Sequence, residues 1–99
     1  MRATIEIFAP SSAETLIATG TVEIGSAVVD HGPKIPAEFV GTPLRARLTL
    51  SGVATNAKYA VIGSDGSHSG IKSLTGGHPA TITMRGGDSV RLAPLGIKL

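Results

Sequence analysis

Apolar and polar residues alternate strictly along residues 44–50, and this is the clearest pattern in the chain. A period of two is typical of a half-buried β-strand, because successive side chains leave a strand on opposite faces. The stretch is therefore predicted to be a strand that points Arg45, Arg47 and Thr49 outward. Its inward side carries four apolar residues: Leu44, Ala46, Leu48 and Leu50.

Similar β-prone runs recur along the chain, separated by glycine and proline. Strands are predicted at residues 3–8, 43–50, 58–62, 71–74 and 80–85, with a brief pairing at 27–30 and a single helical turn over 37–39. The end of the chain is predicted as two runs, 89–93 and 96–99, split by Pro94. Turns at this spacing favour an all-β fold, either a small β-sandwich or a compact β-barrel. We expect about six to eight short, mostly antiparallel strands in a single domain over residues 1–99.

Residues 11–24 admit two interpretations. Ser11 followed by Glu14 fits a capping box, and Gly20 would end a short helix. Against this, several β-prone residues between 15 and 24 favour a strand. We prefer a turn at residues 10–13 followed by a strand over residues 16–24.

Two glycine pairs, Gly76-Gly77 and Gly86-Gly87, invite a phosphate-binding interpretation. A P-loop also needs the Gly-Lys-Ser/Thr ending and a following helix, and this sequence has neither. Hairpin turns that require a positive φ explain the same glycines. Asp65-Gly66 is likewise a turn signal.

Composition limits the stability of such a fold. The aromatic residues are Phe8, Phe39 and Tyr59, so the core must be built mainly from small aliphatic side chains. The chain has no cysteine, which excludes disulfides and thiolate metal sites. We expect a modestly stable monomer that gains from association with copies or a partner. Glu6 interrupts any apolar leader, and no run is long enough for a membrane span, so we expect cytoplasmic synthesis without a signal peptide.

Charge is divided unevenly between the two halves. Residues 1–43 carry a formal charge of −3 and residues 44–99 carry +5. Arg45 and Arg47, with Lys58, Arg85 and Arg91 on later predicted strands, could form a basic stripe for nucleic acid on an oligonucleotide-binding barrel. Such platforms normally add aromatic rings for base stacking, and Tyr59 is the obvious candidate in this half. Nucleic-acid binding is therefore the alternative function and not the preferred one.

Candidate chemistry gathers in one loop, where Asp65, Ser67 and His68 stand close together in sequence. Nucleophilic catalysis needs a base that contacts the nucleophile and a third group that orients the base. Ser, Asp and Gly are common in turns, and this explains the composition of the loop without catalysis. We therefore predict no catalytic site. His31, His68 and His78 lie in Gly-, Ser- or Pro-rich stretches without zinc-motif spacing and are expected to be solvated. No cofactor or metal is predicted.

The last eight residues are unusually apolar for a chain end. Chain ends fray unless something holds them, so residues 92–99 are either a final core strand or an arm that docks on a neighbouring subunit. Only 16% of the residues are charged, against about 25% in a typical domain, which suits a subunit surrounded by neighbours. We predict a non-enzymatic assembly protein, most concretely a phage virion component such as a capsid decoration (cement) protein or small tail protein. The predicted contact residues are Arg45, Arg47, Leu92, Leu95, Ile97 and Leu99.

Overall fold

The structure is a computed structural model that describes residues 1–12 and 14–99. This part of the chain forms eight strands and one short 3-10 turn, which confirms the all-β prediction. The elements are β1 (Arg2–Phe8), β2 (Leu16–Glu23), β3 (Val29–His31), η1 (Ala37–Phe39), β4 (Pro43–Leu50), β5 (Asn56–Ile62), β6 (Lys72–Thr75), β7 (Ala80–Arg85) and β8 (Ser89–Pro94).

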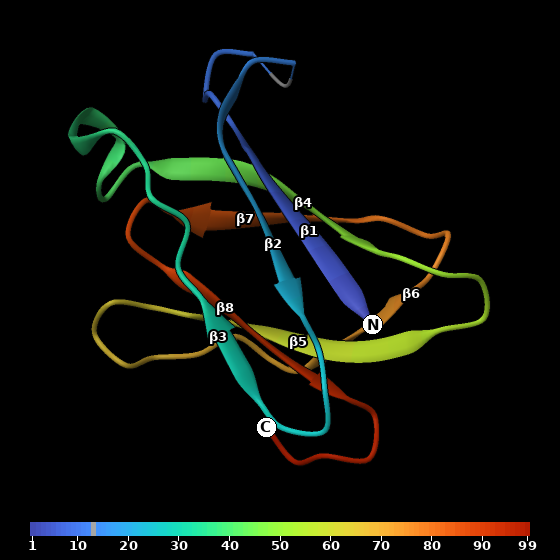
Figure 1. The fold of residues 1–99 in the computed structure, drawn as a ribbon. Coiled ribbons are helices and arrows are strands. Elements are labelled where there is room, and N and C mark those ends of the chain that lie inside the picture. The colour runs from blue at the N-terminus through green and yellow to red at the C-terminus, as the bar shows by residue number, and fades with distance from the viewer. Residues whose placement is uncertain (13) are drawn as a thin grey trace.

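The strands form two separate four-stranded antiparallel sheets that pack as a sandwich (Figure 1). Sheet A has the order β2-β1-β4-β7, and sheet B has the order β3-β8-β5-β6. Because the two sheets are separate, the chain adopts the sandwich and not the closed barrel.

Strand pairing in this sandwich is nested. β5 pairs with β6, β4 with β7, and β3 with β8, so a long folded ribbon wraps into two layers. This is the pairing plan of a double-sheet jelly roll. If this series continued, β2 would pair with a strand that follows β8. Its partner is instead β1, the strand that precedes it in the sequence. β1 therefore lies inside sheet A, between β2 and β4.

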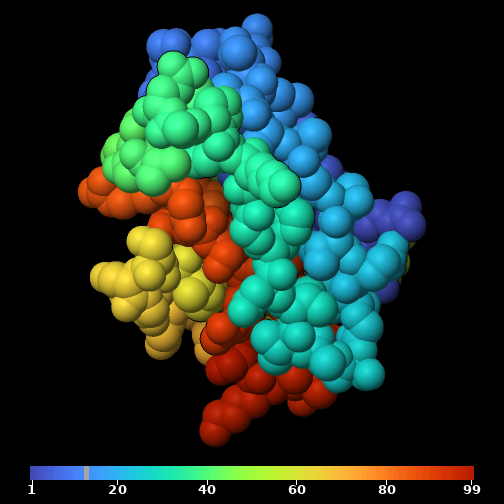
Figure 2. Space-filling view, turned by 60° about the vertical axis from the view of Figure 1, so that its left-hand side comes forward, coloured from blue at the N-terminus to red at the C-terminus, as the bar shows by residue number. Residues whose placement is uncertain are grey.

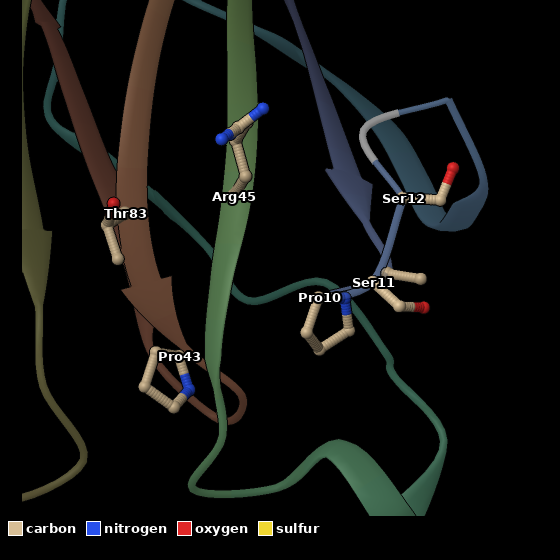
Figure 3. A pocket seen from close by; sticks show the side chains of 7 residues that line it. Pro10, Ser11, Ser12, Pro43, Arg45 and Thr83 are labelled. Carbon is tan, nitrogen blue, oxygen red and sulfur yellow. The ribbon is translucent and has the colours of Figure 1, made fainter.

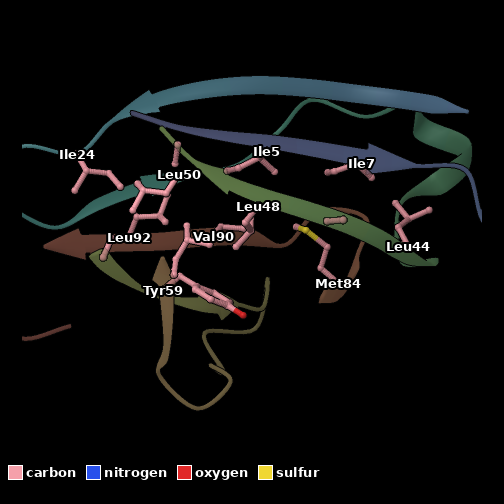
Figure 4. Packing of buried hydrophobic residues seen from close by; sticks show 14 residues of the cluster. Ile5, Ile7, Ile24, Leu44, Leu48, Leu50, Tyr59, Met84, Val90 and Leu92 are labelled. Carbon is pink, nitrogen blue, oxygen red and sulfur yellow. The ribbon is translucent and has the colours of Figure 1, made fainter. Parts of the chain in front are cut away.

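The core lies between the sheets and is built by the predicted alternation (Figure 4). In β4 the four apolar residues of the pattern are buried, while Arg45 and Arg47 are exposed. Tyr59 and Val90 meet them from sheet B. Leu92, predicted as a contact residue, is 0% exposed within this core, so it is not available to a partner in this structure. The largest fully buried side chains are Ile5, Ile7, Leu44, Leu48, Leu74, Leu92 and Val90.

Most predicted strands are confirmed, including the preferred strand over residues 16–24, which is observed as Leu16–Glu23. Part of the preferred turn at 10–13 falls on residue 13, outside the described residues. Two predicted elements differ. The pairing predicted at 27–30 is shifted to Val29–His31. Residues 96–99 form no strand, because the chain turns after Pro94 with a hydrogen bond from the Ile97 N–H to the Pro94 carbonyl.

Glycine has the predicted role in two hairpins. Gly77 has φ 83° and Gly87 has φ 100°, a region where an L side chain is strained. Both residues lie in the turns that flank β7. The positive φ explains the second glycine of each pair, whereas Gly76 and Gly86 lie so close to the Gly52 and Phe39 carbonyl oxygens that a Cβ atom would not fit.

One side of the sandwich is closed by the connection between the sheets. His31 ends β3 and points inward beside Val90, its register partner. Its Nε2 atom is buried without a hydrogen-bond partner, which corrects the expectation of a solvated loop histidine. In the space-filling view, the chain that follows β3 runs beside β2 toward η1 (Figure 2). β2 and β3 are the edge strands on this covered side.

Candidate docking site

The outer face of sheet A carries the predicted arginines. Register aligns Phe8 with Arg45 and Glu6 with Arg47 on neighbouring strands. The Arg47 guanidinium lies 5.2 Å from the centre of the Phe8 ring, and its Nη1 atom is 3.7 Å from Glu6 Oε1. Arg47 therefore covers the outward-facing ring of Phe8. Its guanidinium is partly occupied by contacts with Phe8 and Glu6 of the same chain.

Arg45 stands beside a separate cleft of about 380 Å³ on the same sheet (Figure 3). Pro10–Ser12 of the β1–β2 connection border it on one side, and Thr83 of β7 borders it on the other. Arg45 forms no ion pair with the residues that the structure describes. Of the two predicted arginines, Arg45 is thus the more available to a partner.

The basic residues do not assemble into one stripe. Arg45 and Arg47 project from sheet A, whereas Lys58 and Arg91 belong to sheet B and face away from the core. Arg91 also donates two hydrogen bonds to Asp30, from Nε at 2.7 Å and Nη2 at 3.1 Å. Those bonds hold the pKa of Asp30 below its ordinary value of 3.8. The five predicted basic residues are thus divided between two sheets, with Arg45, Arg47 and Arg85 on sheet A and Lys58 and Arg91 on sheet B.

The predicted loop residues do not form a catalytic triad. The Ser67 hydroxyl donates to Asp65 Oδ1 at 2.6 Å, and the Ser67 backbone N–H donates to the same oxygen at 3.0 Å. These two hydrogen bonds hold the pKa of Asp65 below its ordinary value of 3.8. His68 Nδ1 instead lies 3.0 Å from the Ser69 carbonyl oxygen. Ser67 and Asp65 form a turn, and His68 does not contact Ser67 as a base would.

Two further hollows lie beside β7, the edge strand of sheet A opposite β2. One, of about 630 Å³, lies between β7 and the 63–67 loop and includes Asp65, Arg85 and Asp88. The other, of about 210 Å³, lies between β7 and sheet B and is lined partly by Tyr59, Val61 and Ile82. Thr83 borders both of them, as well as the cleft beside Arg45. Sequence reasoning did not single out Thr83, because alternation shows that a residue is in a strand and not that the strand is at an edge.

Residues 95–99 lie outside the sheets. Leu95 is 54% exposed, while Ile97 and Leu99 are half-buried. Leu99 borders a small hollow of about 100 Å³ on the outer side of sheet B, together with Ile62 and Ile71. Ile71 is itself 56% exposed. Of the predicted segment 92–99, residues 92–94 thus belong to strand β8, and residues 95–99 are an apolar segment outside the strands.

Comparison of the chain with protein-family models, curated proteins and solved structures finds no match. In residues 1–12 and 14–99, no helix has the length and apolar character needed to cross a membrane. The same residues contain no group of three or more His, Cys, Asp or Glu side chains placed to hold a metal ion.

Proposed function

We propose that this chain is a non-enzymatic assembly protein that docks on other protein subunits, including copies of itself. The apolar segment 95–99 is the observation that carries the proposal, because it leaves the sheets after β8 and keeps Leu95 more than half exposed. Large apolar side chains that a monomer leaves exposed are typical of interaction sites when they gather in one place. Ile71 lies on the same outer side of sheet B and enlarges the apolar surface.

A virion component is the most concrete form of this proposal, either a capsid decoration (cement) protein or a small tail protein of a phage. The nested strand pairing is compatible with it, because double-sheet jelly rolls include viral capsid domains as well as lectins and cupins. The low share of charged residues also suits a subunit surrounded by neighbours. Genes for capsid, portal or tail proteins beside the coding sequence are expected, and an unrelated gene neighbourhood counts against the virion.

Self-association is tested by the mass of the protein in solution. Size-exclusion chromatography with light scattering, over a wide range of concentrations, should show an oligomer for the full chain. Removal of residues 95–99 should shift the mass toward the monomer, while circular dichroism still shows the β spectrum because the deleted residues belong to no strand. A monomer at every concentration, unchanged by the deletion, would contradict the proposal.

A further inference from the structure

β7 presents unpaired backbone groups along its free edge. Among residues 1–12 and 14–99 it pairs only with β4, in the register Arg85↔Pro43 through Ala80↔Leu48. The Arg85 N–H donates to Asp88 Oδ2 at 3.0 Å and its carbonyl accepts from the Asp88 N–H at 2.9 Å, so both backbone groups point away from β4. Backbone direction alternates along an antiparallel strand. The N–H and C=O groups of Thr83 and Thr81 therefore also point away from β4, toward the free edge.

Space for another strand lies beside this edge. The hollows of about 630 and 210 Å³ follow β7 along its length. Apolar atoms of Tyr59, Val61, Ile82 and Met84 contribute to their walls. An extended segment that added to β7 would find backbone hydrogen-bond partners in Thr81 and Thr83 and apolar surface under every second side chain.

Residues 95–99 have the pattern that such an edge requires. Leu95, Ile97 and Leu99 alternate with Gly96 and Lys98, so an extended conformation would place the three apolar side chains on one face. In the structure, the segment makes one backbone hydrogen bond, from Ile97 to Pro94, among the described residues. This single bond and the half-buried side chains of Ile97 and Leu99 are what hold the segment in its present position.

Charge selects the direction in which the segment would lie. Asp65 and Asp88 line the hollow at the Arg85 end of β7, whereas Lys72 lines the hollow toward the other end. The Arg85 guanidinium is engaged by the Gly41 carbonyl at 2.9 Å, on the β4 side. Lys98 is the one charged side chain in residues 95–99. It meets the two carboxylates when the segment runs parallel to β7, and it meets Lys72 when the segment runs antiparallel.

We propose that residues 95–99 of one copy add to sheet A of a second copy as a fifth strand, parallel to β7. Leu95, Ile97 and Leu99 then cover the apolar wall formed by Tyr59, Val61 and Ile82. Lys98 lies on the opposite, outer face of the added strand, where Thr83 and Arg85 border the hollow that holds Asp65 and Asp88. The contact joins different surfaces of the two copies, so it builds a ring where the rotation closes and a filament where it does not. This inference rests on the self-association proposed above and names the surfaces that carry it.

Zero-length cross-linking tests the contact directly. The full chain is prepared with and without ¹⁵N, the two preparations are mixed, and a carbodiimide is added to join neighbouring amines and carboxylates. Mass spectrometry is expected to find Lys98 joined to Asp65 or Asp88 between differently labelled copies. Cross-links of Lys98 only to other carboxylates would overturn the assignment.

Proline variants separate this edge from the other edge of sheet A. Thr83→Pro removes an N–H group from the free edge of β7. Thr21→Pro, on β2, is the matched control. Ile24 exchanges two backbone hydrogen bonds with Met1, so the backbone groups of Ile24 point toward β1. Backbone direction alternates along the strand, and the Thr21 N–H therefore points away from β1. Loss of one strand-addition hydrogen bond and its neighbours should weaken association about tenfold or more in Thr83→Pro, and less than about twofold in Thr21→Pro. Equal weakening in both variants would contradict the proposal.

A binding measurement does not depend on how well the proline variants fold. The chain that ends at Pro94 is labelled with ¹⁵N and titrated with a synthetic peptide of residues 94–99. Amide signals of Thr81 and Thr83 are expected to shift most. Shifts confined to β2, or to the outer face of sheet B, would overturn the edge assignment while leaving the proposed self-association intact. A full chain that stays monomeric would remove both proposals.

Discussion

The imidazole of His31 lies against Gly20, so that each of the two covered edge strands contributes one residue to the contact. A Cβ atom on Gly20 would lie 2.5 Å from His31 Nε2 and 2.9 Å from Cε1. Such a contact is too short for real atoms, so Gly20→Ala must displace the ring or separate β2 from β3. We expect Gly20→Ala to lower the free energy of unfolding by about 1–3 kcal/mol, as overpacking usually does.

Denaturant titration of a double-mutant cycle checks this prediction. In the His31→Ala background the ring is gone, and Gly20→Ala should cost little or even stabilise, since alanine restricts the unfolded chain. Gly25→Ala is the control, because a Cβ atom on Gly25 would have no neighbour within 4 Å. Equal effects of Gly20→Ala with and without His31 would show that the ring is not the cause.

Truncation to alanine should have very different effects on stability at Leu92 and Leu95, although the two residues are only three positions apart. Leu92 is fully buried between the sheets, so Leu92→Ala should lower stability by about 2–5 kcal/mol through lost burial and a cavity. Leu95 is 54% exposed, and Leu95→Ala should change the stability of the monomer by less than about 0.5 kcal/mol. Thermal unfolding of dilute samples measures both. A large loss of monomer stability in Leu95→Ala would mean that the segment is part of the core.

Acid should weaken the contact between β3 and β8. The pKa of Asp30 in the unfolded chain is about 3.9. In the folded state the hydrogen bonds from Arg91 hold this pKa below 3.8. The carboxylate therefore stabilises the fold above about pH 4, and this contribution is lost as the pH falls through the lower folded-state value. Melting temperatures of the wild type and Asp30→Asn should differ by a constant amount above about pH 5 and converge in stronger acid.

Glu38→Gln serves as the control for this pH series, because Glu38 is exposed in η1 and forms no ion pair with the described residues. Its melting curve should follow that of the wild type. A difference between wild type and Asp30→Asn that does not change with pH would exclude the ionised carboxylate as its source.

Removal of the Arg47 side chain should expose the aromatic ring beneath it. Arg47→Ala uncovers Phe8 and loses the cation–π contact, so stability should fall by about 0.5–1 kcal/mol. Arg45→Ala is the matched control, since it lies two residues along the same strand face and makes no such contact with the described residues. Urea unfolding of the two variants compares them, and an equal cost would argue against the ring contact.

Local chemistry made much of this fold predictable. The strict alternation in β4 shows which side chains face the core, and the glycines in the flanking turns of β7 mark where the chain must adopt a positive φ. Short elements with a weak alternation pattern were harder to predict from the sequence. β3 has only three paired residues, and its position depends on Asp30 and Arg91, which are 61 residues apart.

The candidate docking site was only partly predictable. The apolar character of residues 95–99 is visible in the sequence, but Leu92 has the same character and lies in the core. Thr81 and Thr83 look like any outward-facing strand residues until the sheet order shows that β7 has one neighbour. Edge position depends on the pairing of distant strands, and alternation contains no information about that pairing.

The position of β1 has a consequence for the order in which the chain folds. β1 and β2 can form a local hairpin early, but the second edge of β1 remains empty until β4 has been synthesised. In sheet B, β3 and β5 have no link until β8 arrives between them. A topology governed by such distant pairings should fold on the slower scale of milliseconds to seconds. On the ribosome, the nascent chain cannot complete sheet A before β7 has emerged, or sheet B before β8 has emerged.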